Sequence, residues 1–118
     1  MQMHIKTLVF ALLLAAANAT AWAHHGWSSY DAEKSIKIEA QVTDVQYRNP
    51  HAELDVLHEG STWDVILAPI ARMESRGLSR EDLAVGKTIT IEGYPRRDGT
   101  HEIRAERISV DGKTIELR

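Results

Sequence analysis

The sequence predicts an all-β domain with one short helix, arranged as a five-stranded antiparallel OB-like barrel with the helix between strands 3 and 4. Three observations support this fold class. Apolar and polar residues alternate with a period of two in most of residues 36–110. Asn-Pro, Glu-Gly and Asp-Gly pairs separate the alternating stretches. Only the stretch after Pro69 has helical spacing. An open β-sandwich is the alternative arrangement of the same strands.

The first two strands meet at the corner Arg48-Asn49-Pro50-His51. Apolar residues occupy alternate positions from Ile36 to Val42, and again from Ala52 to Val56, so each strand has one buried face. Asn-Pro ends the first strand because proline fixes its own φ and restricts the residue before it. The apolar phase slips by one residue near Thr43-Asp44, which predicts a β-bulge.

The remaining elements follow in order. Glu59-Gly60-Ser61 is a hairpin turn into a strand whose inward residues are Trp63, Val65 and Leu67. A short helix runs from Pro69 to Arg76 and stops at Gly77, and Ser79 with Asp82 indicates a capped turn. The last strands are residues 88–94, residues 102–110 after an Asp-Gly turn, and a short closing strand at 114–117.

Residues 1–23 have the pattern of a secretory signal peptide. Lys6 precedes ten apolar residues, and Ala21-Trp22-Ala23 is a small-x-small cleavage site, with Ala19 as the alternative cut. Cleavage after Ala23 leaves an arm at 24–34, which we expect Trp27 and Tyr30 to hold down, and a barrel domain at 35–118. The predicted location is the periplasm. The chain has no cysteine, so its apolar core must suffice for stability.

Charge and hydropathy exclude two classes of partner. The 14 Lys and Arg residues against 17 Asp and Glu give a net charge of −3, and loss of Lys6 with the signal peptide makes it −4. This balance argues against nucleic acid, which requires a basic face. A run of ten apolar residues is too short to cross a bilayer, so we expect no membrane span in the mature protein.

Several short motifs resemble a known family. They are His24-His25-Gly26-Trp27, Asn49-Pro50-His51, Trp63-x-Val65, Arg76-Gly77-Leu78 and Gly93-x-Pro95-x-x-Asp98-Gly99. Their order and spacing resemble a family of small exported bacterial proteins that is catalogued as a domain of unknown function, and the similarity covers the mature chain. Leu78 stands where members often carry Trp. The resemblance implies an exported location and this fold, and it implies no activity or cofactor.

The histidines suggest a metal site. Cleavage after Ala23 gives His24 both a ring nitrogen and a free α-amine, whose ordinary pKa of about 8 lets a divalent ion displace its proton at neutral pH. One further imidazole, from His51 or His25, completes a three-nitrogen set that resembles the histidine brace of exported copper proteins. Such a set favours Cu(II). The predicted metal ligands are therefore His24 and His51, with His25 as the alternate.

A structural role is the alternative for each histidine. An His-His pair after a cleavage site is often solvated, and His51 can simply bond a turn carbonyl. We expect His58 and His101 to lie on the surface. In the expected strand order the first strand begins near His58, at the opposite end from His51, so the arm of 11 residues, about 36 Å when extended, would have to reach back.

The second functional hypothesis is an accessory domain that holds a peptide, polymer or protein partner. Its binding face would consist of Tyr47, Arg48, Tyr94 and Arg96. The sequence favours a binding module over an enzyme because no nucleophile elbow or oxyanion loop accompanies Ser28, Ser29 and His25. The carboxylates of Glu53, Asp55 and Asp64 alternate outward and are interpreted as solvated surface, and Trp27 and Trp63 as core. A metal-based hydrolase or oxidase stays a third class.

Overall fold

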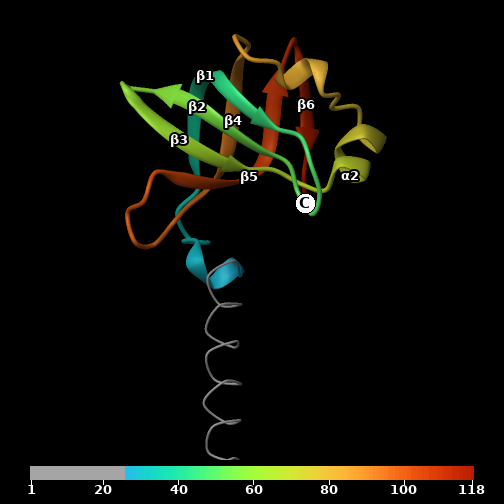
Figure 1. Cartoon of the computed structure of the whole chain (residues 1–118). Coiled ribbons are helices and arrows are strands. Elements are labelled where there is room, and N and C mark those ends of the chain that lie inside the picture. The colour runs from blue at the N-terminus through green and yellow to red at the C-terminus, as the bar shows by residue number, and fades with distance from the viewer. Residues whose placement is uncertain (1–25) are drawn as a thin grey trace, which may run out of the picture.

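Six strands form one strongly curved sheet in the computed structural model, which describes residues 26–118 (Figure 1). The strands are β1 (Ile36–Gln46), β2 (Glu53–His58), β3 (Ser61–Ile66), β4 (Thr88–Pro95), β5 (Glu102–Val110) and β6 (Lys113–Glu116). The one α-helix of these residues, α2 (Ile70–Ser75), follows β3 in the chain. Two 3-10 turns, η1 (Trp27–Ser29) and η2 (Glu81–Leu83), complete the elements.

The sheet closes into a mixed barrel of five strands, with β6 as an extra strand on β5. The strand order is β3-β2-β1-β4-β5-β6, and β3 also pairs with β5. The expectation of a fully antiparallel barrel was wrong, because β3 and β5 run parallel from Asp64↔Glu102 to Ile66↔Arg104. The reason is parity: in a ring with an odd number of strands, direction cannot alternate at every neighbour. Five strands therefore require one parallel seam.

Long strands with bulges let the sheet turn. β1 pairs with β4 through residues 36–41 and with β2 through residues 41–46, so one strand serves both sides of the barrel. The register of β1 against β2 shifts between Val42 and Asp44, which confirms the bulge predicted there. A second shift lies between Glu92 and Gly93, where a Cβ on Gly93 would stand 2.1 Å from the carbonyl oxygen of Arg104.

The interior of the barrel is apolar. Alternate residues of the strands point inward, and Met73 of α2 and Leu83 of η2 cover the remaining opening. Leu54, Val65, Ile91 and other core side chains are at most 1% exposed. None of residues 26–118 is a fully buried polar or charged residue. Burial of each large aliphatic side chain contributes about 1.5–3 kcal/mol, so the core can hold the domain together without disulfides.

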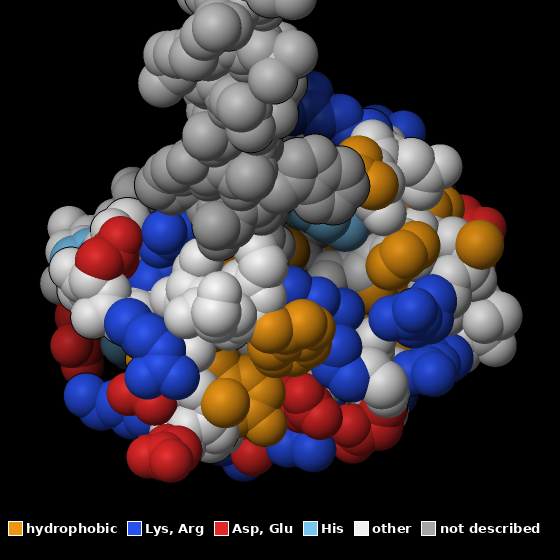
Figure 2. All heavy atoms as spheres, turned by 90° about the horizontal axis from the view of Figure 1, so that it is seen from below, with side chains coloured by type: hydrophobic (Ala, Val, Ile, Leu, Met, Phe, Trp, Pro, Cys, Tyr) orange, Lys and Arg blue, Asp and Glu red, His pale blue; other side chains and the backbone are white. Residues whose placement is uncertain are grey.

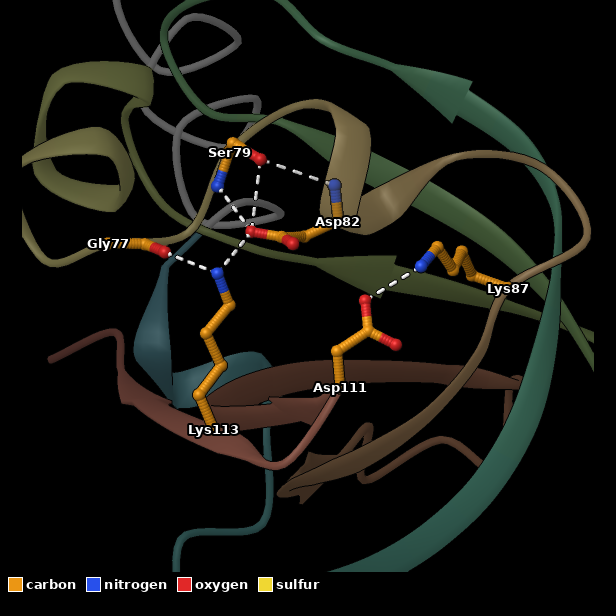
Figure 3. A network of polar contacts seen from close by, with 6 residues as sticks. All are labelled: Gly77, Ser79, Asp82, Lys87, Asp111 and Lys113. Atoms are coloured by element: carbon orange, nitrogen blue, oxygen red, sulfur yellow. Dashed lines mark hydrogen bonds and ion pairs between the residues drawn. The ribbon is translucent and has the colours of Figure 1, made fainter.

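A polar network joins the segment after α2 to the strand β6 (Figure 3). Asp82 Oδ2 accepts hydrogen bonds from the backbone N–H and the hydroxyl of Ser79, at 2.9 and 3.0 Å, and the Asp82 N–H returns to that hydroxyl. This reciprocal pair confirms the capped turn predicted there. Lys113 Nζ lies 2.7 Å from Asp82 Oδ2 and also donates to the carbonyl of Gly77. The network thereby holds the helical connection against the sheet.

The residues before β1 pack on the end of the barrel by two aromatic side chains of different character. Tyr30 is 5% exposed and forms an isolated bridge with Arg96. Trp27 is 45% exposed, so its interpretation as core was wrong. Its ring instead lies edge-on to Tyr94, at 6.2 Å, and over the guanidinium of Arg104. Trp63 is half-buried and packs against the core as expected.

Candidate functional site

A large pocket opens where the β1–β2 loop, the β3–β5 seam and the C-terminal residues meet. It has a volume of about 840 Å³, and we call it the His51 pocket. The C-terminal end lies beside the β1–β2 loop (Figure 1). Its acidic wall consists of Glu53, Asp64 and Glu102, and its arginine wall consists of Arg72, Arg104 and Arg118. A volume of this size is typical of pockets for small ligands.

The acidic wall follows directly from the barrel closure. The parallel seam sets Asp64 opposite Glu102, and the β2–β3 hairpin brings Glu53 alongside. Glu102 is already neutralised in part, because Tyr30 Oη donates to it at 2.6 Å and Arg96 lies 3.2 Å away. Asp64 has no cation or hydroxyl donor of this kind among residues 26–118, and its side chain shares a hydrogen bond with Glu102. Burial, followed by the charges of Glu53 and Glu102, raises the pKa of Asp64 from 3.8 to about 7.

For Glu53 and Asp64 this finding corrects the interpretation as solvated surface, whereas Asp55 does not line the pocket. Alternation along β2 and β3 does place Glu53, Asp55 and Asp64 on the outer side of the sheet. The pocket nevertheless lies on that side of the sheet, and Tyr30 and the C-terminal Arg118 form part of its lining. Burial, then the bond to Glu102, raises the pKa of the Tyr30 hydroxyl above its ordinary value. A carboxyl with a raised pKa in a cleft is a mark of a functional site.

His51 lies at the mouth of the pocket. Its Nδ1 is 3.6 Å from Glu53 Oε1, which is too long for a hydrogen bond, and has no hydrogen-bond partner within residues 26–118. The side chain as a whole is 36% exposed. The other two predicted ligands, His24 and His25, lie outside the described residues. Within residues 26–118, no group of three or more His, Asp or Glu side chains is placed so that it could hold a metal ion.

The arm leads to this same pocket. Tyr30 lines it together with His51, and Trp27 stacks on Arg104 of its arginine wall. The arm thus reaches the His51 pocket at Tyr30, before β1 begins. His24 precedes Gly26 by two residues, a span of at most about 7 Å.

The four residues predicted as a partner face are divided between two places. Arg48 and Arg96 line the His51 pocket, and Tyr94 lies beside it under Trp27. Tyr47 belongs to a separate depression next to α2, where its hydroxyl donates to Glu74 at 3.2 Å and Arg80 lies over its ring. His101 and His58 are also elsewhere: both contact Trp63, and the ring of His101 stacks on it at 4.6 Å.

Sequence reasoning missed the arginine wall. Arg104 alternates with the buried residues Ile103 and Ala105, so the pattern identified it only as an outward residue of its strand. The parity of a five-strand ring was the available signal, since it places the start of β5 beside β3. Nothing local indicates that Arg72 and Arg118, which are 46 positions apart in the sequence, meet at the same wall.

The fold and the pocket define a class: small all-β barrel domains with a charged pocket at one end. The chain matches the family of unknown function DUF6152 over residues 11–104 and belongs to it, which confirms the resemblance seen in its motifs. No curated protein matches the chain. None of the helices in residues 26–118 is long and apolar enough to cross a membrane.

A solved structure also resembles this chain. It is the crystal structure of the ZRD-deleted mutant of TiaS in complex with agmatine, with a TM-score of 0.52 and 12% sequence identity. The alignment covers 74% of this chain and 27% of that chain, so this chain corresponds to about a quarter of that protein. At such low identity the likeness shows a shared fold and nothing about the ligand.

Proposed function

We propose that this protein is an exported, periplasmic OB-like module that binds a divalent transition metal, copper first, at the mouth of the His51 pocket. The observation that carries the proposal is that Tyr30 of the arm and His51 line one pocket. The processed terminus would then begin six positions before Tyr30, a residue of the same pocket as His51. The Nδ1 atom of His51 has no partner among residues 26–118. The strand order, with a β3–β5 seam, supports the OB-like description.

The ligands are His24, through its ring and its α-amine, and His51, with His25 as the alternate. Three nitrogen donors suit Cu(II), which stands at the top of the affinity order for divalent metals. Binding displaces the α-amine proton, so affinity rises with pH up to about pH 8. The carboxylate of Glu53, 3.6 Å from His51 Nδ1, keeps a negative charge beside the metal.

Titration of correctly processed protein with Cu(II), followed by electron paramagnetic resonance, tests the proposal. We expect one tight site with nitrogen hyperfine structure. His51→Gln should weaken binding at least tenfold, whereas His101→Gln, which changes an imidazole stacked on Trp63, should not. A version with one additional N-terminal residue should also bind more weakly. Equal affinity of the extended and the natural terminus would refute the α-amine ligand.

Export itself is tested separately. Mass spectrometry of the protein from the periplasmic fraction should give a chain that begins at His24. A chain that retains residues 1–23, or that is found only in the cytoplasm, would remove the free amine of His24 and with it the metal proposal.

A second candidate function is an accessory domain that holds a peptide, polymer or protein partner. It is favoured by the exposure of Trp27, 45%, next to Tyr94 and close to Arg48 and Arg96 at the rim of the pocket. Aromatic and arginine side chains of this kind are enriched in protein interfaces. Titration with extended peptides and cell-wall polymers, followed by tryptophan fluorescence, should show saturable binding that Tyr94→Ala reduces. Unchanged binding in that variant would contradict this face.

A further inference from the structure

The arginine wall carries three positive charges that have no negative partner among residues 26–118. Three other arginines, Arg96, Arg97 and Arg107, are paired with carboxylates, and Arg107 lies 2.9 Å from Glu92 and 2.8 Å from Glu116. For Arg72, Arg104 and Arg118, no carboxylate of residues 26–118 lies within ion-pair distance. Residues 1–25 contain no Asp or Glu. No side-chain carboxylate before Asp31 can therefore serve as a partner.

Most of the N–H donors on this wall have no hydrogen-bond partner among the described residues. A guanidinium carries five N–H donors. Arg72 donates one to the carbonyl of Leu117 at 3.1 Å, and Arg118 donates one to that of Leu67 at 2.8 Å. The Nε atoms of Arg104 and Arg118 are buried and have no partner within residues 26–118. Buried polar groups in native proteins are almost always satisfied, so these donors indicate a missing acceptor.

Holding these charges together costs free energy. Burial, followed by repulsion from Arg104 and Arg72, lowers the pKa of Arg118 to about 10. Burial likewise lowers the pKa of Arg104, and Arg72 adds to the effect. Arg104 and Arg118 are partly buried, and partial burial of like charges next to one another is unfavourable without a counter-ion. The packing of the barrel does not need them, because the core is formed by aliphatic side chains on the other side of the sheet.

Trp27 fixes the orientation of the wall. Its ring lies 3.6 Å from Arg104 Cζ and 5.3 Å from Arg118 Cζ, which are cation–π contacts. In Figure 2 Lys and Arg side chains lie beside hydrophobic side chains on this face. A guanidinium held by its face keeps the N–H groups along its edge for an acceptor, and such a fork suits two oxygens of one anionic group. The wall is thus preorganised before any ligand arrives.

From this geometry we infer that the arginine wall binds the carboxylate or phosphate group of a small ligand in the His51 pocket. Two or three guanidinium forks converge on a tetrahedral or planar oxyanion, which supplies the missing charge and accepts the unused N–H groups. The site goes beyond the proposed copper site and does not require it, because none of its residues is a metal ligand. The acidic wall of the same pocket selects for ligands that also carry a hydroxyl or ammonium donor.

Isothermal titration calorimetry of the EDTA-treated protein with inorganic phosphate and, separately, with citrate tests this inference. We expect at least one probe to bind, and the stronger one identifies the anion as phosphate or carboxylate. Arg104→Gln should weaken binding more than tenfold. Arg104→Lys should also weaken it, because it keeps the charge and loses the fork. The matched control is Arg107→Gln, which removes the same charge from β5 outside the pocket and should stay within twofold of wild type.

The outcomes separate clearly. Absence of binding for both probes, or equal losses in Arg104→Gln and Arg107→Gln, would overturn the inference. Removal of an unpaired charge relieves repulsion, so Arg104→Gln should keep a cooperative thermal transition; Arg118→Gln provides a second variant with the same expected loss. His51→Gln should bind the anion as wild type does. A wild-type protein that binds the anion but not Cu(II) would end the metal proposal and leave this site intact.

Discussion

The raised pKa of Asp64 makes a prediction about stability that can be worked from the structure. The substitution Asp64→Asn replaces the carboxyl by an amide that can donate to Glu102, as the protonated acid does. In the unfolded chain Asp64 loses its proton near pH 3.8, and in the folded protein only near pH 7. Between these values the folded state binds more protons than the unfolded state. The free energy of unfolding of the wild type therefore falls as pH rises from about 4 to about 7, and then levels off.

The size of the effect follows from the same pKa. A rise from 3.8 to about 7 corresponds to a ceiling of about 4 kcal/mol. Water in the open pocket screens the charges of Glu53 and Glu102, so we expect about half of this, roughly 2 kcal/mol. Asp64→Asn lacks this contribution. Its stability relative to wild type should therefore increase by roughly 2 kcal/mol between pH 4 and pH 8.

Urea denaturation followed by tryptophan fluorescence, at several pH values from 4 to 9, measures this difference. Comparison with wild type at each pH cancels the titration of all other groups. The control is Glu59→Gln at the β2–β3 turn, where the side chain is 86% exposed, and its difference from wild type should not depend on pH. A constant difference for Asp64→Asn, or a variant less stable than wild type at pH 8, would refute the placement of this carboxyl beside two others.

Three further predictions concern the fold. Hydrogen bonds from Lys113 and then from Ser79 lower the pKa of Asp82 from 3.8 to about 2, so Asp82→Asn should cost about 1 kcal/mol in urea denaturation above pH 4, a loss that disappears as pH falls toward 2. In contrast, Asp111→Asn breaks an exposed pair with Lys87 (Figure 3), and its thermal midpoint should stay within error of wild type in 0.15 M salt; a fall of several degrees would contradict this. Gly93→Ala places a Cβ against the backbone of Arg104, so it should destabilise the domain by about 3 kcal/mol or more, and a cost below 1 kcal/mol would show that β4 and β5 approach less closely.

The strands could be predicted from the sequence because their signals are local. Period-two alternation located β1 and β2, and the phase slip located the bulge between Val42 and Asp44. Gly77 ended the helical segment where expected, with a φ of +93°. These signals depend on a residue and its near neighbours along the chain, so one sequence contains all of them.

The candidate site was less predictable because it is made of contacts between distant segments. His51 was identified from its place after Pro50, but its neighbours were not. Asp64 looks like any outward carboxylate until the seam sets it opposite Glu102. Arg104 has the same outward position as the paired residue Glu102. Which outward side chains become enclosed depends on the closure of the ring, and alternation alone does not specify that.

The parallel pairing of β3 with β5 connects ligand binding in the pocket with protection against aggregation. Only three residue pairs join β3 to β5, and two of them, Asp64↔Glu102 and Ile66↔Arg104, contribute side chains to the pocket. If this junction parts, the pocket is lost and two unprotected strand edges become available to other molecules. A compound that binds in the pocket should therefore stabilise the β3–β5 junction against local opening. We expect it to slow amide hydrogen exchange across the junction and to slow aggregation.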